Sequence, residues 1–334
     1  MFQCWQELSP PARYALGRAA SQERQMVTSD ATSKMGEVRI GLCSWTDKSL
    51  IESGALYPPG VDDAKGRLRY YASHFPIVEV DSSYYALPSE RNSRLWVERT
   101  PDGFTFNVKA YSLFTNHPTR THSLPKAIFK ALPHEAQAKE RIYFDGVPGE
   151  LRHELWGIFD SALRPLHEAG KLGTILFQFP HWFFPGRKGF SHILGCRRSL
   201  ADYRLAIEFR NNVWLNQDNI EDTLAFLEAY DMTFVCVDEP QGFRSSCPPV
   251  AAVTSDMAMV RFHGRNADTW EKKGITAAER FNWYYKREEM DGWVPKIREM
   301  AEEAREVHLM INTCYRDQSV VNARLLQEQL AQVG

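Results

Sequence analysis

The chain has 334 residues, a length that suits one large α/β barrel or two ordinary domains, and its 43% hydrophobic and 25% charged residues exclude a disordered protein. Its 40 Lys and Arg residues against 42 Asp and Glu residues give a net charge of −2, so no overall field favours nucleic acid or an anionic membrane. No run approaches the roughly 18 apolar residues of a membrane span, and we expect no membrane partner and a cytoplasmic location.

Residues 1–35 differ from the rest of the chain. They mix Ser, Thr, Gln, Ala and a Pro-Pro pair without a sustained hydrophobic period. The acids Glu7, Glu23 and Asp30 in this stretch are atypical of an organellar transit peptide. We therefore expect 1–35 to be a flexible N-terminal extension and 36–334 to form one domain.

From Val38 onward, short β-branched or aromatic runs alternate with helical patterns. Eight runs predict strands: VRIGLCSW (38–45), IVEVDSSYY (77–85), FTFNVKA (104–110), GTILFQFP (173–180), RLAIEFRNN (204–212), TFVCVDEP (233–240), AMVRFHGRN (258–266) and VHLMINTC (307–314). The clearest helix is predicted over Trp293 to Ala304, where apolar residues recur at helical spacing. Between strands three and four, Leu151 to Ala169 predicts the covering helix, while 111–149 is an insertion that either lids the barrel or forms a passive excursion.

Alternating strands and helices indicate a parallel sheet covered by helices. Eight strands favour a closed (β/α)8 TIM barrel, because closure leaves no edge strand. A doubly wound open sheet is the competing architecture. It is disfavoured because no strand-to-helix turn carries a glycine-rich phosphate-binding motif.

Strand alternation predicts which side chains face the lumen of the barrel and which face the helices. The set assigned to the helices is apolar throughout and includes Val235 and Val237 on the sixth strand. The set assigned to the lumen is mostly polar: Cys43 and Trp45; Glu79 and Asp81; Asn107 and Lys109; Leu176 and Gln178; Glu208 and Arg210; Cys236 and Asp238; Arg261 and His263; Met310 and Asn312. Barrel enzymes build their sites at the carboxyl ends of the strands, so these positions predict the functional site.

Four lumenal residues are candidates for catalysis. Glu208 is the first choice for a general acid or base, because a lumenal carboxylate beside Arg210 can have a tuned pKa, and Glu79 supplies a second carboxylate. Lys109 could form a Schiff base with a carbonyl substrate, and His263 could shuttle a proton. Each has a structural alternative, since these charges can also neutralise one another as a buried ion-pair network.

Other residues are candidates for substrate binding. Polar groups expected near the mouth are Asp81, Gln178, Arg210, Asp238 and Asn312. Trp45 is expected to form part of an aromatic stacking wall. In the loop after strand seven, Gly264 can expose a backbone N–H and Arg265 can supply a forked donor, which together fit an anionic group such as phosphate.

The sequence requires no cofactor, although a divalent metal is possible. Its ligands would come from Glu79, Glu208, Asp238 and His263, a set that mixes hard carboxylates with one imidazole. Carboxylates on separate strands are weak evidence for a metal, and we assign no metal site.

From about Val38 to Leu330 the chain resembles the DUF72 (YecE-like) family of uncharacterised TIM-barrel proteins. The matching elements are GLCSW (41–45), LRYYASHFPIVEVDSSYYALP (68–88), TPDGFTFNVKA (100–110), KLGTILFQFP (171–180), AIEFRNNVW (206–214), SSCPPVAAVTSDMAMVRFHGRN (245–266) and NTCYRDQSVVNARLL (312–326). The resemblance implies the same barrel but no established reaction. Two positions depart from the family pattern: Asp81 stands where Asn is more frequent, and Thr313 follows Asn312 in place of a second Asn.

Three functions remain open. We favour an enzyme, a hydrolase, lyase or isomerase in class, that uses acid/base chemistry on a small anionic or carbohydrate-like substrate at the mouth of the barrel. The alternatives are a divalent-metal-dependent hydrolase or isomerase acting on a sugar or phosphodiester, and a barrel that binds a ligand without catalysis. A nucleic-acid partner would need a basic rim that the net charge does not indicate.

Overall fold

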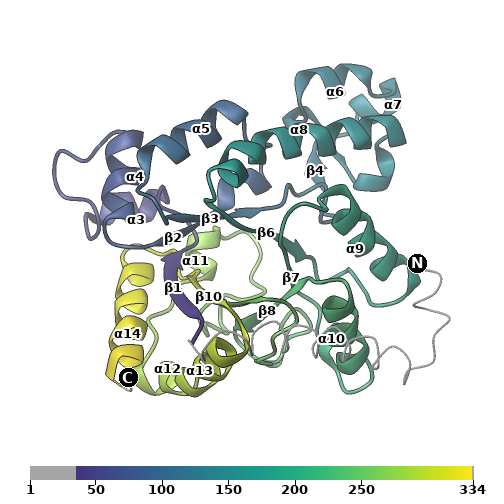
Figure 1. Ribbon diagram of the computed structural model, residues 1–334. Helices are drawn as coiled ribbons and strands as arrows, with labels where there is room; N and C mark the ends of the chain where they lie inside the picture. Colours follow the sequence, from purple (N-terminus) through teal and green to yellow (C-terminus); the bar gives the residue numbers. More distant parts are fainter. Residues whose placement is uncertain (1–34, 333–334) are drawn as a thin grey trace.

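The computed structural model describes residues 35–332, and its centre is a closed barrel of eight parallel strands (Figure 1). The strands are β1 (Glu37–Leu42), β2 (Ile77–Val80), β3 (Thr105–Lys109), β6 (Leu172–Phe179), β7 (Leu205–Phe209), β8 (Thr233–Asp238), β9 (Met257–Phe262) and β10 (Glu306–Ile311). Around the barrel they follow the order β1, β10, β9, β8, β7, β6, β3, β2. The predicted (β/α)8 TIM barrel is confirmed. The flexible extension predicted for 1–35 lies, except for Met35, outside the described residues.

Helices connect the strands and cover the barrel. They are α3 (Lys48–Ser53), α4 (Ala64–Ala72), α5 (Glu90–Arg99), α8 (Gly149–Glu168), α9 (Arg187–Ser199), α10 (Ile220–Ala229), α11 (Ala277–Arg280), α12 (Arg287–Asp291), α13 (Val294–Glu303) and α14 (Gln318–Gln332). The helix predicted over 293–304 is α13, with Trp293 as its N-cap residue, and the covering helix predicted over 151–169 is α8. Among the described residues, no helix is both long and apolar enough to cross a membrane.

The insertion between β3 and α8 forms small elements of its own. These are the two-stranded antiparallel pair β4 (Thr119–Arg120) and β5 (Arg141–Ile142) and the short helices α6 (Lys126–Ala131) and α7 (His134–Gln137). Figure 1 shows α6 and α7 beside α8, on the outside of the barrel. Most of the insertion therefore extends the outer wall, and only its first residues lie near the mouth of the barrel.

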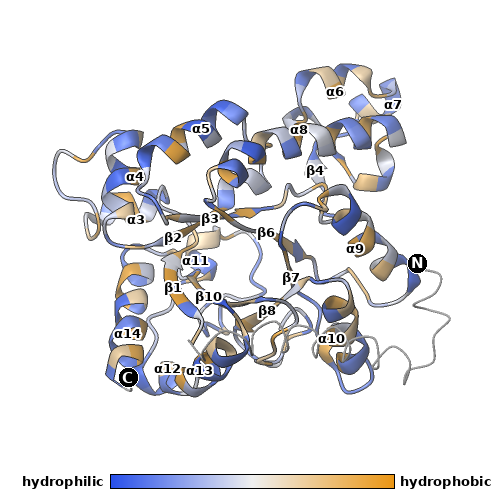
Figure 2. Cartoon of the chain, in the orientation of Figure 1, coloured by the Kyte–Doolittle hydropathy of each residue, from blue (hydrophilic) through white to orange (hydrophobic). Residues whose placement is uncertain are grey.

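Aromatic stacking fixes the helix-facing side of β6 and β7. Phe179 stacks on Phe183 with ring centroids 4.3 Å apart, and Phe209 stacks on Trp214 at the same distance. Trp214 is fully buried and donates its indole N–H to the Phe183 carbonyl at 2.8 Å. In Figure 2 the barrel strands are mostly orange and white, whereas the helices also carry many blue residues. The apolar side of the sheet therefore supplies the core between strands and helices.

The register of β8 corrects one prediction. Residues paired in register on neighbouring parallel strands point to the same side, and Val237 pairs with the lumenal Arg261 while Asp238 pairs with Phe262. Val237 therefore faces the lumen and Asp238 faces the helices, so the predicted lumenal placement of Cys236 and Asp238 is wrong. A shift of one residue exchanges the two faces of a strand, and the run VCVD offers few polar residues to fix the phase.

Gly41 and Gly157 give a matched test of the packing. A Cβ at Gly41 would lie 2.0 Å from the Ile77 carbonyl oxygen, whereas a Cβ at Gly157, in the interior of α8, would have no atom within 4 Å. We expect Gly41→Ala to lower the free energy of unfolding by about 2 to 3 kcal/mol, because β1 and β2 must separate. Gly157→Ala should raise it by up to about 1 kcal/mol, since alanine favours a helix interior. Urea unfolding of the two variants measures both values, and equal effects would contradict this account.

Candidate active site

A guanidinium at the centre of the lumen joins three strands. Arg261 on β9 makes two bonds to Glu79 on β2, from Nη2 to Oε1 at 2.6 Å and from Nε to Oε2 at 3.0 Å. Its Nη1 donates to Oε2 of Glu208 on β7 at 2.5 Å. All three side chains are fully buried. Two predicted catalytic carboxylates are thus held on either side of one cation.

The second carboxylate oxygen of Glu208, Oε1, contacts three side chains that lie nearer the mouth. Oε1 lies 2.6 Å from Nε of Arg210, accepts from Nε2 of Gln178 at 2.7 Å, and lies 3.2 Å from Nε2 of His263. Burial opposes the charge of Glu208, but Arg261 and Arg210 together hold its pKa well below the ordinary range. Glu79 differs, because burial raises its pKa more than Arg261 lowers it. Glu208 is therefore a fixed anion near neutral pH and a poor proton donor.

Glu239 extends this chain of charges and was missed by the sequence analysis. Its carboxylate accepts from Nη1 of Arg210 at 2.8 Å and from the backbone N–H of Cys247 at 2.6 Å. Burial raises the pKa of Glu239 to about 8, although Arg210 lowers it in part. Glu239 follows β8 two residues after Val237, so it points to the same, lumenal side. With the correct register of β8, the sequence would have predicted Glu239 as a lumenal residue. The carboxyl group keeps its proton at neutral pH.

His263 and Asn312 lie beside Glu208. Nδ1 of His263 lies 2.9 Å from the amide Nδ2 of Asn312, and its Nε2 lies 3.0 Å from Nη2 of Arg210 and 3.2 Å from Oε1 of Glu208. Burial, reinforced by the positive charge of Arg210, lowers the pKa of His263 well below its ordinary value. The imidazole is therefore neutral, and its contacts orient Glu208.

A second charged pair lies closer to solvent. Nζ of Lys109 is 3.0 Å from Oδ1 of Asp81 and 5.0 Å from the centre of the Tyr84 ring. Burial opposes the charge of Lys109, but the carboxylates of Asp81 and Glu79 raise its pKa. Lys109 is therefore a stable cation, which favours a role in holding charge over attack on a carbonyl.

Aromatic rings from the loops surround these groups. His117, another residue that the sequence analysis did not single out, lies 5.3 Å from the Tyr84 ring and 5.6 Å from the Trp182 ring. Burial and the charge of Lys109 lower the pKa of His117 to about 3. Trp270, in the loop after β9, lies over Arg210 at 5.2 Å. Loop residues follow no strand or helix period, so no sequence pattern could have placed Trp270 or His117 here.

The phosphate-type anchor predicted at Gly264 and Arg265 is not assembled. The N–H of Gly264 donates to the hydroxyl of Tyr285 at 2.9 Å, and Nη2 of Arg265 pairs with Oδ2 of Asp238 at 2.6 Å. Asp238 also accepts from the Trp293 indole at 2.7 Å, on the helix side of the barrel. These groups satisfy one another. Gly264 has a structural role, because its φ of 81° and a Trp283 atom 2.6 Å from a would-be Cβ exclude other residues.

Trp45 also lies outside the lumen. Its ring packs edge-on against Trp96 of α5 at 5.9 Å and near the helix-facing Phe106 at 6.4 Å. The strand β1 ends at Leu42, so the alternation used to place Trp45 no longer applies there. Of the residues predicted to bind substrate, the structure brings Asp81, Gln178, Arg210 and Asn312 to the mouth. Trp45 packs on the helix side, and Arg265 pairs with Asp238 in a pocket beside Glu239.

The four candidate metal ligands are not brought together. Asp238 faces the helices, and Arg261 occupies the space between Glu79 and Glu208. Within residues 35–332, no group of three or more His, Cys, Asp or Glu side chains has an arrangement that could hold a metal ion. The carboxylates of the lumen are neutralised by arginine.

The sequence model described as "Protein of unknown function DUF72" matches residues 39–334. The chain belongs to the DUF72 family. It is 32% identical to the UPF0759 protein YunF of Bacillus subtilis (strain 168) over 297 residues, which cover 88% of this chain and 94% of that protein.

Two solved structures of DUF72 family proteins are also similar. The protein from Thermotoga maritima MSB8 is 28% identical, with a TM-score of 0.69 and coverage of 88% of this chain and 99% of that one. The protein from Enterococcus faecalis V583 is 27% identical, with a TM-score of 0.70 and coverage of 88% and 95%. These relatives support the DUF72 barrel and bring no named reaction to it.

Arg261 is the first target for a stability test. We expect Arg261→Met to lower the free energy of unfolding by about 3 to 5 kcal/mol, because it leaves buried Glu79 without its cation and leaves Glu208 with Arg210 alone. Adding Glu79→Gln and Glu208→Gln to Arg261→Met removes those charges and should restore much of the loss. Chemical unfolding of the single and triple variants tests this, and an equally large or larger loss in the triple variant would contradict it.

Glu239 gives a prediction for the pH dependence of stability. Between the ordinary carboxyl pKa of 4.5 and about 8, the folded protein keeps a proton on Glu239 that the unfolded chain releases. The contribution of Glu239 to stability should therefore fall as pH rises through this window, by about 1 kcal/mol per pH unit. His117 and His263, whose pKa values burial lowers, act in the opposite direction up to their ordinary pKa of 6.5, so the fall is measured above about pH 7. Glu239→Gln should remove this contribution, so that above about pH 7 its stability falls with pH less steeply than that of the wild type. The exposed Glu221→Gln is the control and should leave the slope unchanged.

Proposed function

We propose that this protein is an enzyme that performs acid/base chemistry on a small anionic substrate at the carboxyl-terminal mouth of the barrel. The observation that carries the proposal is Glu239, a buried carboxyl group with a pKa of about 8, held by Arg210 and a backbone N–H. Perturbed acids of this kind cluster at catalytic sites, and barrel enzymes build their sites at this end of the strands.

The proposed roles follow from the protonation states. Glu239 serves as the general acid, because it holds a proton at neutral pH. Arg210 and Lys109 stabilise negative charge on the substrate. Glu208, which the sequence predicted as the acid or base, instead fixes the position of Arg210 as a permanent anion. Two neighbouring carboxyl groups with widely separated pKa values are typical of sites that divide proton transfer from charge stabilisation.

Access to Glu239 depends on the loop that carries Trp270. This side chain is buried over Arg210, and its indole N–H donates to the hydroxyl of Ser245 at 3.0 Å. Loops at this end of barrels often close over a bound substrate. We infer that the loop opens to admit a ligand, which then contacts Lys109 and the neighbouring ring of Tyr84. The exposed aromatic side chain of Tyr85 fits a ligand with a ring or sugar face.

A metal-dependent reaction receives no support from the side chains at the mouth, since arginine nitrogens take the carboxylate oxygens that a cation would need. The remaining alternative is a barrel that binds a ligand without converting it. Glu239→Gln distinguishes the two, because it keeps the shape of the site and removes the transferable proton, at the loss of one of the two hydrogen bonds that the carboxyl oxygens accept from Arg210 and Cys247.

The test starts with a panel of small carboxylates and phosphate esters, scored by the rise in melting temperature of the protein. We expect at least one compound to stabilise the wild type and to lose most of its effect with Lys109→Met. The exposed Lys65→Met is the matched control and should behave as wild type. If no compound binds, or if both lysine variants lose binding equally, the proposed anionic substrate is wrong.

A compound that binds is then followed by NMR for conversion. We expect the wild type to convert it, with activity that falls above about pH 8 as Glu239 loses its proton. Glu239→Gln should bind the compound with an affinity near that of the wild type and convert it more than about a hundredfold more slowly. Binding without conversion by the wild type would support the non-catalytic alternative.

A further inference from the structure

A groove lies outside the barrel, between α8, α9 and the loop that joins β6 to α9. Its volume is about 1100 Å³, and its lining includes Arg152, Trp182, Phe184, Arg187, Lys188 and Gly195. Trp182 separates this groove from the mouth, since the same side chain contacts His117 at the mouth and donates to the carbonyl of Asn116 at 3.3 Å. Neither Lys109 nor Arg210 lines the groove, so its ligand does not depend on the function proposed for the mouth.

The rim of the groove is basic. Arg152, Arg187 and Lys188 line it together with one acid, Asp145, which lies 3.6 Å from Arg152. Both Arg187 and Lys188 are exposed, and within the described residues neither forms an ion pair with an acidic side chain. The net charge of −2 for the whole chain therefore hides a local positive site that favours an anionic ligand.

Two large aromatic side chains are exposed along the same groove. Trp182 is 41% exposed and Phe184 is 42% exposed, although most aromatic side chains of the barrel are buried. The guanidinium of Arg244 lies 5.2 Å from the centre of the Phe184 ring. Exposed rings beside cations offer a stacking surface for a planar ring and a partner for the charge attached to it.

Gly195 adds an independent observation on the wall of the groove. It lies within α9, where glycine weakens a helix, and a Cβ at this position would have no protein atom within 4 Å. Packing within the described residues therefore gives no reason for a glycine. Its effect is to leave the helix backbone uncovered, which allows a ligand to approach closely.

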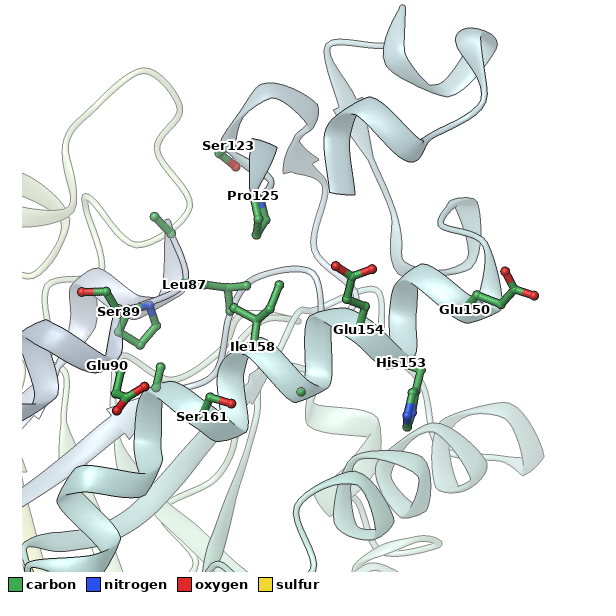
Figure 3. Close-up of a pocket in the computed structure, with 14 residues that line it drawn as sticks. Leu87, Ser89, Glu90, Ser123, Pro125, Glu150, His153, Glu154, Ile158 and Ser161 are labelled. Atoms are coloured by element: carbon green, nitrogen blue, oxygen red, sulfur yellow. The ribbon is translucent and has the colours of Figure 1, made fainter. Parts of the chain in front are cut away.

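We propose that this groove binds a nucleotide, with the base stacked on Trp182 or Phe184 and the phosphate held by Arg187 and Lys188. A second groove gives a contrast within the same chain. It has a volume of about 840 Å³ and lies between α5 and α8, where Leu87 and Ile158 point into it (Figure 3). Three acids, Glu90, Glu150 and Glu154, line that groove and would repel a phosphate.

Isothermal titration calorimetry with AMP tests the proposal, with adenosine and inorganic phosphate as partial ligands. We expect AMP to bind and each partial ligand to bind at least about tenfold more weakly, because the ring and the phosphate contribute separately. Lys188→Glu should weaken AMP binding by about tenfold or more and should leave the fold intact, since an acid suits the first turn of α9. The matched charge reversal Arg324→Glu lies on α14, on the opposite side of the barrel in Figure 1, and should leave AMP binding unchanged.

Gly195→Leu separates a binding role from a structural one. We expect it to keep or raise the melting temperature, because leucine favours a helix and the space is open, and yet to weaken AMP binding by about tenfold. A structural glycine would produce the reverse, with a lower melting temperature and unchanged binding.

A labelled single strand of about eight thymidylates distinguishes a free nucleotide from a segment of nucleic acid. If the strand binds about tenfold more tightly than AMP, and Lys188→Glu loses both, the ligand of the groove is a nucleic-acid strand. Binding of AMP alone assigns a free nucleotide. If neither probe binds the wild type at millimolar concentration, or if Arg324→Glu loses as much binding as Lys188→Glu, the proposal is overturned.

Discussion

The rest of the site depends on one interaction, the burial of the Arg261 guanidinium between Glu79 and Glu208. A charged group inside a barrel is costly unless its hydrogen bonds are satisfied, and here three of its nitrogens meet carboxylate oxygens. The three side chains come from β9, β2 and β7, which are not neighbours in the barrel. The lumen is thus crosslinked by charge in a layer where most barrels use branched apolar side chains.

That layer determines the protonation of the groups above it. Because Glu208 is kept ionised by two arginines, its free oxygen can hold Arg210 and orient neutral His263. Arg210 in turn reaches Glu239, where one shared cation is too weak to offset complete burial, so the carboxyl group stays protonated. The alternation of charges from the centre to the mouth lowers the pKa of Glu208 and leaves that of Glu239 raised. The ion pairs that hold the lumen together therefore also set the pKa values of its carboxyl groups.

The sequence predicted the barrel and most of the lumen because polar residues interrupt otherwise apolar strands. Glu79, Glu208 and Arg261 each stand alone between buried apolar neighbours, which fixes the phase of their strands. On β8, where Val and Cys alternate, only Asp238 indicated which side chains face the lumen. That indication was wrong, because Asp238 binds partners among the helices. Beyond the strand ends the rule fails altogether: Trp45 lies outside the lumen, and Trp270 reaches the mouth from a loop. Contacts made by loops depend on tertiary folding, which no local period encodes.

Net charge was the least informative property of the sequence, and the structure explains why. The charges of the lumen cancel pairwise, so they contribute almost nothing to the sum, while the basic rim with Arg187 and Lys188 is balanced by acids on other faces such as Glu150 and Glu154. Screening limits the influence of an exposed charge to about 10 Å, so a ligand responds to the face it approaches and not to the total. A near-neutral chain can therefore carry a neutralised lumen, an acidic groove and a basic groove on one barrel.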